Sequence, residues 1–262
     1  MKVVKFNKLS EYDIIEHGFS TKIGGVSKGI YESMNLGFNR GDSDENVREN
    51  FKIISKFLNM PYENMVLSAQ THTTNIKIVT EKDKGKGIIY PRDYENIDGL
   101  ITNESQIPLV TFYADCVPLV LFDPVKKVIA ASHSGWRGTV MKMGKVTVDK
   151  MVEVYGCNPK DIIACIGPSI CKKCYEVSAD VGEAFMEEFK DWGYENIVFP
   201  KNDEKYHIDL WEANKTIFKM SGIEENNIEV SEICTCCNNE WLFSHRATDG
   251  KRGNLAAFIM LK

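Results

Sequence analysis

Three side chains that could act together lie at the ends of segments expected to form strands. Cys116 follows Asp115 in the sequence ADC, and His133 begins the sequence HSGWRG. Both belong to residues 108–138, which we expect to form two apolar strands joined by a tight turn. His72 lies where a β-rich segment gives way to polar residues. Two histidines, one thiolate and an open fourth position could form a catalytic zinc site, and the same ligands can hold copper.

Each of these residues also has a simpler interpretation. Cys116 could be a small buried side chain among apolar neighbours, and His72 could be a hydrogen-bonded loop histidine. Without a metal, Cys116 could act as a nucleophile with His133 as its base, which would predict an amidase or a peptidoglycan hydrolase. Asp115 favours a functional site, because a carboxylate among apolar residues needs a role such as orienting a ligand.

Three arginines could bind an anionic substrate. Arg137 could hold a phosphate or carboxylate through two parallel hydrogen bonds, or it could pair with Asp115. Arg40 lies in a loop rich in turn-forming residues, 33–42. Arg246 lies with two further cations in the polar loop 243–253, where the charges could equally be solvated.

Five of the eight cysteines lie in two short segments. Cys171 and Cys174 form one C-x-x-C pair, and Cys234 and Cys237 form another, with Cys236 between them. Two such pairs could form a structural zinc site. The gap between the pairs is much longer than in a zinc ribbon, so the spacing argues against a shared site.

Composition restricts the class of protein. The chain has 262 residues, of which 43% are hydrophobic and 26% charged, the mixture of a globular protein. A net charge of −5 argues against general nucleic-acid binding. The N-terminal residues lack the apolar core of a signal peptide, and no apolar run approaches the roughly 20 residues of a membrane helix. We therefore expect a cytoplasmic protein without a membrane partner, whose cysteines are thiols or metal ligands.

Hydrophobic periodicity predicts alternating helices and strands. Helices are expected at 44–58, 178–189 and 208–221, and a further helix after Gly138 should end at Gly156. Strands are expected at 2–6, 97–103, 162–167 and 227–234, and the last segment should form two strands joined by a polar loop. No linker or internal repeat divides the chain. The sequence predicts a single α/β domain over 1–262, with mixed sheets covered by helices.

Several motifs carry a resemblance to a known family. In order along the chain they are HGFSTKIGGVS, NLGFNRGD, SAQTH, DGLIT, ADCVPLVLFD, ASHSGWRGT, CIGPSICKKCYEV and CTCC followed by FSHRATDGKRGNLAAFI. Together they span almost the whole chain. They resemble the multicopper polyphenol oxidase (laccase) domain family, which includes the bacterial YlmD/YfiH-like proteins and is related to the human enzyme FAMIN.

The resemblance implies an α-β-β-α layered fold, like that of the toxin-related cysteine hydrolases. It implies a zinc site formed by His72, Cys116 and His133, with copper as the other metal, and these residues would be catalytic. The implied reaction is phosphorolysis of adenosine, inosine or S-methyl-5′-thioadenosine, with adenosine deamination as a side activity. Arg137, Arg40 and Arg246 would bind phosphate or nucleoside.

Other functions within the resemblance remain open. Copper-dependent polyphenol oxidation fits the family's older name, but the chain has only five histidines, fewer than a true multicopper oxidase needs. Some relatives are described as non-catalytic partners in cell-envelope quality control. The family often has Tyr where His245 stands, which makes His245 an uncertain substrate contact. A monomer or homodimer is expected.

Overall fold

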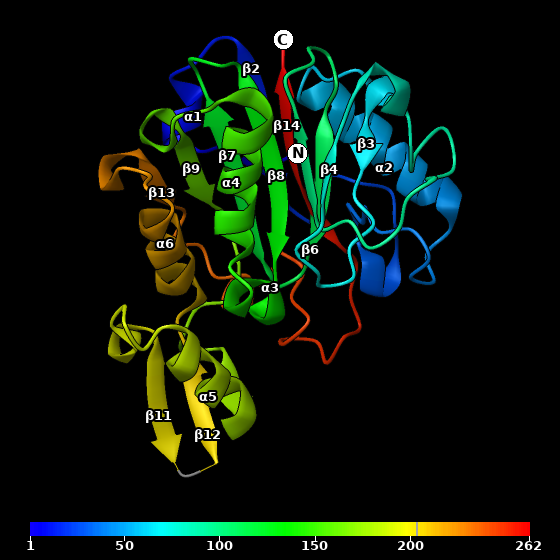
Figure 1. The fold of residues 1–262 in the computed structure, drawn as a ribbon. Helices are drawn as coiled ribbons and strands as arrows, with labels where there is room; N and C mark the ends of the chain where they lie inside the picture. The colour runs from blue at the N-terminus through cyan, green and yellow to red at the C-terminus, as the bar shows by residue number, and fades with distance from the viewer. Residues whose placement is uncertain (203) are drawn as a thin grey trace.

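Two mixed β-sheets pack face to face in the computed structural model, which describes residues 1–202 and 204–262. One sheet has the strand order β1-β2-β14-β6-β3, and the other has the order β13-β9-β7-β8-β5-β4. Helix α2 covers the outer face of the first sheet, and α4 and α6 cover the outer face of the second (Figure 1). These layers confirm the predicted α-β-β-α arrangement.

The elements are bounded as follows. The strands are β1 Val3–Val4, β2 Ile15–Ser20, β3 Val66–Leu67, β4 Ile76–Ile78, β5 Gly99–Thr102, β6 Leu109–Tyr113, β7 Val117–Asp123, β8 Val128–Ser134, β9 Ile163–Ile166, β10 Glu176–Ser178, β11 Val198–Asn202, β12 Lys205–Ile208, β13 Ile228–Val230 and β14 Leu255–Leu261. The helices are α1 Asn7–Ser10, α2 Asp44–Phe57, α3 Trp136–Val140, α4 Met143–Tyr155, α5 Ala179–Glu188 and α6 Leu210–Met220.

Alternation along the central strands divides the core into layers. In β7, Leu119 and Leu121 face α4 and α6, whereas Val120 and Phe122 face the other sheet. In β14, the odd-numbered residues from Leu255 onward face the same inter-sheet layer, and the even-numbered residues face α2. Because both faces of these strands are buried, each reads as a continuous apolar run rather than as an alternating pattern.

Local signals located the helices correctly. Helix α2 begins after Ser43, whose side chain accepts a hydrogen bond from the backbone N–H of Asn46. Helix α4 ends at Gly156, which adopts a left-handed conformation with φ of 65°. The helix predicted after Gly138 is interrupted, however, because Lys142 is left-handed and separates α3 from α4.

One strand prediction in the C-terminal segment was wrong. The chain around Trp241 forms turns instead of a strand: the N–H groups of Trp241 and Leu242 both bond to the carbonyl of Asn238. Only β14 forms in the C-terminal segment, although Leu242 and Phe243 are buried. The sequence analysis also missed β10, β11 and β12, which form a separate three-stranded sheet beside α5 (Figure 1).

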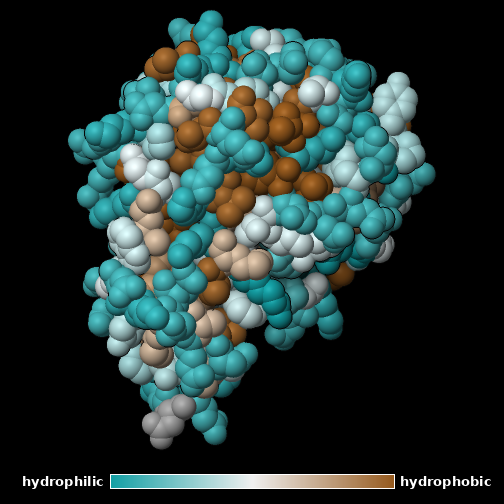
Figure 2. All heavy atoms as spheres, in the orientation of Figure 1, coloured by the Kyte–Doolittle hydropathy of each residue, from teal (hydrophilic) through white to brown (hydrophobic). Residues whose placement is uncertain are grey.

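The visible surface is mostly hydrophilic. Hydrophobic residues gather over α4 and the strands beside it (Figure 2). No helix in the described ranges has the length and apolar character that a membrane crossing requires.

Candidate active site

His72, Cys116 and His133 converge in the structure. Their potential ligand atoms all lie within 4.8 Å of one another. His72 comes from the loop after β3, Cys116 from the connection between β6 and β7, and His133 from β8. The two imidazole rings lie 4.9 Å apart at an angle of 70°. A nitrogen, sulfur and nitrogen donor set of this kind suits zinc or copper.

Cys116 is positioned by a crossing between the two sheets. Residues 108–138 form three strands and a short helix rather than two strands: β6 belongs to one large sheet, and the β7–β8 hairpin belongs to the other. Asp115 has φ of 84°, a left-handed conformation that ends β6 and turns the chain. Its buried carboxylate accepts hydrogen bonds of 2.6 Å from Thr235 Oγ1 and from the backbone N–H of Arg246. These bonds hold the turn that presents Cys116.

Asp98 organises both histidines. Its carboxylate lies 2.8 Å from Nδ1 of His133, which leaves Nε2 of that ring for the site. The same carboxylate accepts backbone N–H bonds from Thr71, His72 and Thr73, each at 3.0 Å. His72 is itself left-handed, with φ of 65°, so these bonds hold a loop conformation that a non-glycine residue rarely adopts.

Charge interactions distinguish the two histidines. Burial by itself lowers the pKa of His133, but the adjacent Cys116 and the hydrogen bond to Asp98 outweigh burial and raise that pKa to about 9. Burial raises the pKa of Asp98, yet the bonds from His133 and the loop N–H groups bring it down to about 2. The pKa of His72 is lowered by burial and by His133. Asp98 is therefore an anion at neutral pH.

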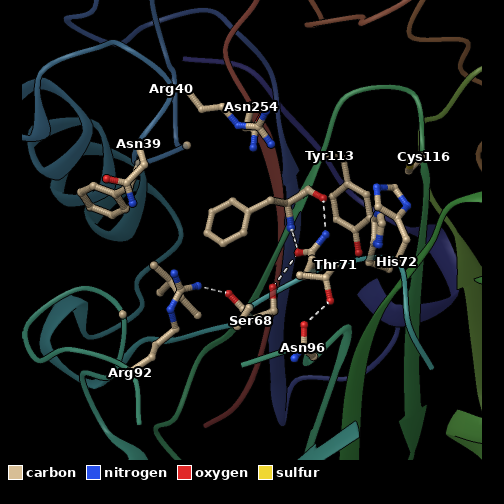
Figure 3. A pocket seen from close by; sticks show the side chains of 18 of the residues that line it. Asn39, Arg40, Ser68, Thr71, His72, Arg92, Asn96, Tyr113, Cys116 and Asn254 are labelled. Carbon is tan, nitrogen blue, oxygen red and sulfur yellow. Dashed lines mark hydrogen bonds between the residues drawn. The ribbon is translucent and has the colours of Figure 1, made fainter. Parts of the chain in front are cut away.

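The three residues lie at one side of a cavity of about 600 Å³. Figure 3 shows His72 and Cys116 on one side, with Arg40 and Arg92 across the cavity. Aromatic residues supply part of the wall, and polar side chains supply the rest. The aromatic residues are Phe38, Tyr94, Phe112 and Tyr113. A cavity of this size and mixed lining can enclose a small organic ligand.

Two guanidinium groups in this cavity are suited to an anion. Arg40 and Arg252 both line it. Burial and the neighbouring Arg40 lower the pKa of Arg252. Nε of Arg252 is buried and has no hydrogen-bond partner among the described residues. Mutual repulsion and an unused donor would both be relieved by a bound anion.

Arg137 and Arg246 lie outside the residues that line the cavity. Arg137 is exposed, and its guanidinium lies 4.3 Å from the ring centroid of Trp136. The guanidinium of Arg246 donates to the carbonyls of Cys174 and Glu176, both at 2.8 Å. His245 is exposed and also does not line the cavity. Substrate contacts by these three residues remain predictions.

The two C-x-x-C pairs lie together, although their spacing in the sequence argued against a shared site. Cys171, Cys174, Cys234 and Cys237 form a second group whose sulfur atoms all lie within 4.8 Å of one another. The long gap in sequence was a poor guide because β13 pairs in parallel with β9, and each C-x-x-C pair follows one of these neighbouring strands.

The sequence analysis missed three residues of the site: Asp98, Arg92 and Arg252. Asp98 fell within the strand predicted at 97–103 and was not singled out, although a carboxylate directly before a buried strand was a usable signal. Arg252 had been noted only as part of a cationic loop. Its position beside Arg40 depends on strand β14 pairing between β2 and β6, which no local pattern reveals.

Comparison with known proteins identifies the family of this chain. Residues 16–262 match the family model described as multi-copper polyphenol oxidoreductase laccase. The chain is 38% identical to the purine nucleoside phosphorylase YlmD of Bacillus subtilis over 251 residues, covering 94% of this chain and 88% of the relative. It is 32% identical to the adenosine deaminase RL5 of an unknown prokaryotic organism, covering 93% and 94%.

A solved structure shares the fold. The crystal structure of the Bacillus licheniformis hypothetical protein YfiH superposes with a TM-score of 0.91 at 33% identity, covering 96% of this chain and 94% of the other. Sequence and structure lead to the same assignment, and this chain belongs to the multi-copper polyphenol oxidoreductase laccase family.

Proposed function

We propose that this protein is a zinc-dependent purine nucleoside phosphorylase that acts on adenosine, inosine and S-methyl-5′-thioadenosine, with adenosine deamination as a side activity. The observation that carries the proposal is one cavity lined by the His72, Cys116 and His133 group and by the Arg40 and Arg252 pair. Relatives named as purine nucleoside phosphorylase and adenosine deaminase support the same reaction class.

The donor set fits a zinc ion. His72, Cys116 and His133 would hold the metal, and the bond from Asp98 to Nδ1 of His133 is the outer partner that metal-bound histidines usually have. Three protein ligands leave a position open to substrate or water, as in catalytic zinc sites. A bound zinc would supply Lewis-acid polarisation of the purine for phosphorolysis and activation of water for deamination.

The arginines would bind the phosphate co-substrate. In phosphorolysis a phosphate oxygen forms a bond to C1′ of the ribose while the bond from C1′ to N9 of the purine breaks. The bonding electron pair leaves with the purine, which takes up a proton, and the products are the free base and ribose 1-phosphate. Positive charge grows on the sugar, so a phosphate anion held by Arg40 and Arg252 stabilises the transition state.

The aromatic wall would hold the base. Phe38 and Phe112 line the same cavity as Arg40, and Tyr113 lies beside His133 with ring centroids 5.7 Å apart. Flat aromatic faces stack on any purine, which fits the proposal that several purine nucleosides are accepted.

The direct test is an assay with inosine. The zinc-loaded protein should release hypoxanthine only when phosphate is present, with ribose 1-phosphate formed in equal amount, both followed by chromatography. Absence of phosphate-dependent base release from all three nucleosides would overturn the proposal. Ammonia released from adenosine in the absence of phosphate would report the deaminase activity separately.

Arg252→Gln tests the anion site. This substitution removes the charge and the unused Nε donor, so KM for phosphate should rise about tenfold or more, the effect of losing one charge-assisted hydrogen bond. Lys251→Gln is the matched control, because Lys251 is exposed, adjacent in the chain and does not line this cavity. Equal effects of the two substitutions would argue against phosphate binding at Arg252.

One observation favours a second candidate. Cys116, His133 and Asp98 form a connected series that resembles the nucleophile, base and orienting carboxylate of a cysteine hydrolase. This alternative predicts an amidase or peptidoglycan hydrolase that works without metal and does not need His72. Full activity on a peptide substrate after chelation, retained in His72→Ala, would favour it over the phosphorylase.

A further inference from the structure

Four cysteines gather at the end of the six-stranded sheet. Strands β9 and β13 run in parallel, and the chain segments continue to pair beyond them through bonds from Ser169 N–H to the Ile233 carbonyl and from Thr235 N–H to the Ser169 carbonyl. This pairing brings the C-x-x-C at 171–174 against the C-x-x-C at 234–237.

The spacing of the sulfur atoms suits a tetrahedral ion. All four Sγ atoms lie within 4.8 Å of one another, and those of Cys174 and Cys237 are 3.4 Å apart. A tetrahedron with zinc–sulfur bonds of about 2.3 Å has sulfur–sulfur edges of about 3.8 Å, which falls between these values. Four thiolates at this distance would repel one another strongly, and a divalent cation removes that repulsion.

Backbone groups already point at one of the sulfurs. The N–H groups of Cys171 and Cys237 donate to Sγ of Cys234 at 3.3 Å and 3.4 Å. Hydrogen bonds of this kind hold a metal ligand in position, as the outer partners of metal-bound side chains do. Cys234 is buried, so its sulfur has little access to water as an alternative donor.

We propose that Cys171, Cys174, Cys234 and Cys237 hold a structural zinc ion, separate from the metal group formed by His72, Cys116 and His133. Four protein sulfurs complete the coordination and leave no open position, so this ion would stabilise structure and would not carry out chemistry.

The ion would also stabilise the turn at Asp115 that precedes Cys116. Arg246 bonds through its guanidinium to the carbonyl of Cys174, and through its backbone N–H to the carboxylate of Asp115. Thr235, next to Cys234, bonds to the other oxygen of the same carboxylate. Asp115 directly precedes Cys116, so an ion that joins the two C-x-x-C segments would also hold the turn that presents this ligand.

Metal content tests the proposal. The full chain, purified under reducing conditions with zinc supplied, should contain two zinc ions per chain by mass spectrometry of the metal. Cys237→Ser and His72→Ala should each lose one ion, because each disrupts a different site. Cys236→Ser is the matched control for the first variant: it lies in the same turn but outside the group of four, and it should keep both ions.

Two further measurements, one on the unaltered chain and one on His72→Ala, cover the case in which Cys237→Ser fails to fold. Crystals examined at the zinc absorption edge should show an anomalous peak among the four sulfurs. Cobalt substitution in His72→Ala should give the intense charge-transfer absorption of a site with several thiolates. No peak at the four cysteines in zinc-loaded crystals, or a Cys174–Cys237 disulfide in freshly reduced protein, would overturn the proposal.

Discussion

At the scale of single residues, the metal group depends on how closely the backbone of Gly135 approaches it. A Cβ atom at this position would lie 2.7 Å from Nδ1 of His72 and 3.2 Å from Sγ of Cys116. Gly135 has an ordinary φ of −70°, so space rather than backbone conformation requires glycine here. The glycine of HSGWRG therefore leaves room for two of the three ligands.

Gly135→Ala should weaken zinc binding about tenfold or more, the range seen when the surroundings of a metal ligand are disturbed. Its stability should stay within about 1 kcal/mol of the original, because alanine can adopt this backbone conformation. Gly138→Ala, in the same motif, is the control: its nearest neighbour would lie at an ordinary 3.5 Å. Zinc titration followed by thermal unfolding measures both effects, and equal zinc affinity in the two variants would contradict the argument.

Asp98 gives a second prediction at this scale. Asp98→Asn removes the negative charge beside Nδ1 of His133, so zinc affinity should fall about 10- to 100-fold. Asp93→Asn removes a nearby carboxylate that pairs with Lys86 on the surface, and it should change zinc affinity little. Competition with a chromogenic chelator measures the affinities. An Asp98→Asn protein that binds zinc as tightly as the original would show that this carboxylate does not support the site.

At the scale of elements, His17 joins the N-terminal segment to β2. Its Nε2 accepts the backbone N–H of Phe6 at 2.9 Å, a bond that requires the neutral ring. Burial and the nearby Lys5 lower the pKa of His17 to about 4, against the opposing effect of Glu16. The attachment of the N-terminal segment to β2 through Phe6 should therefore depend on pH.

Stability should fall as the pH drops from about 6.5 towards 4. In this interval the unfolded chain binds a proton at His17 and the folded chain does not, so the loss reaches about 3 kcal/mol. His17→Gln keeps a possible acceptor for Phe6 but cannot titrate, and its stability should vary less over the same interval. Urea unfolding between pH 7 and 4 measures this, and parallel curves for the two proteins would refute the assignment.

At the scale of the whole molecule, the two large sheets are held together by one apolar layer. Phe122 on β7 is fully buried in that layer, and its ring meets Tyr12 edge-on at 5.2 Å between centroids. The layer includes side chains from β2, β6 and β14 of one sheet and from β7, β8 and β9 of the other. The site residues sit at its margin, since Tyr113 belongs to the layer and also lines the cavity.

Phe122→Ala should lower the free energy of unfolding by about 3–5 kcal/mol, because it removes a buried ring and leaves a cavity between the sheets. Phe57→Ala is the control: this ring is 53% exposed at the end of α2, and its loss should change stability by about 0.5 kcal/mol or less. Chemical denaturation measures both. A small effect of Phe122→Ala would mean that the sheets are not joined mainly by this layer.

The sequence by itself determined the helices with caps and 3.6-residue spacing, the buried strands β8 and β9, and, through their motifs, which residues are candidate metal donors. These features depend on residues that are close in the chain. Only the tertiary structure decided where the donors meet. The turn at Asp115 carries the chain from one sheet to the other, and Asp98 reaches His133 because β5 pairs with β8.

The same reason explains the other differences between sequence and structure. Arg252 lies beside Arg40, and two distant C-x-x-C pairs meet, because strands far apart in sequence pair with one another. Strand pairing between distant segments depends on the burial of whole faces, which a local pattern of residues does not encode.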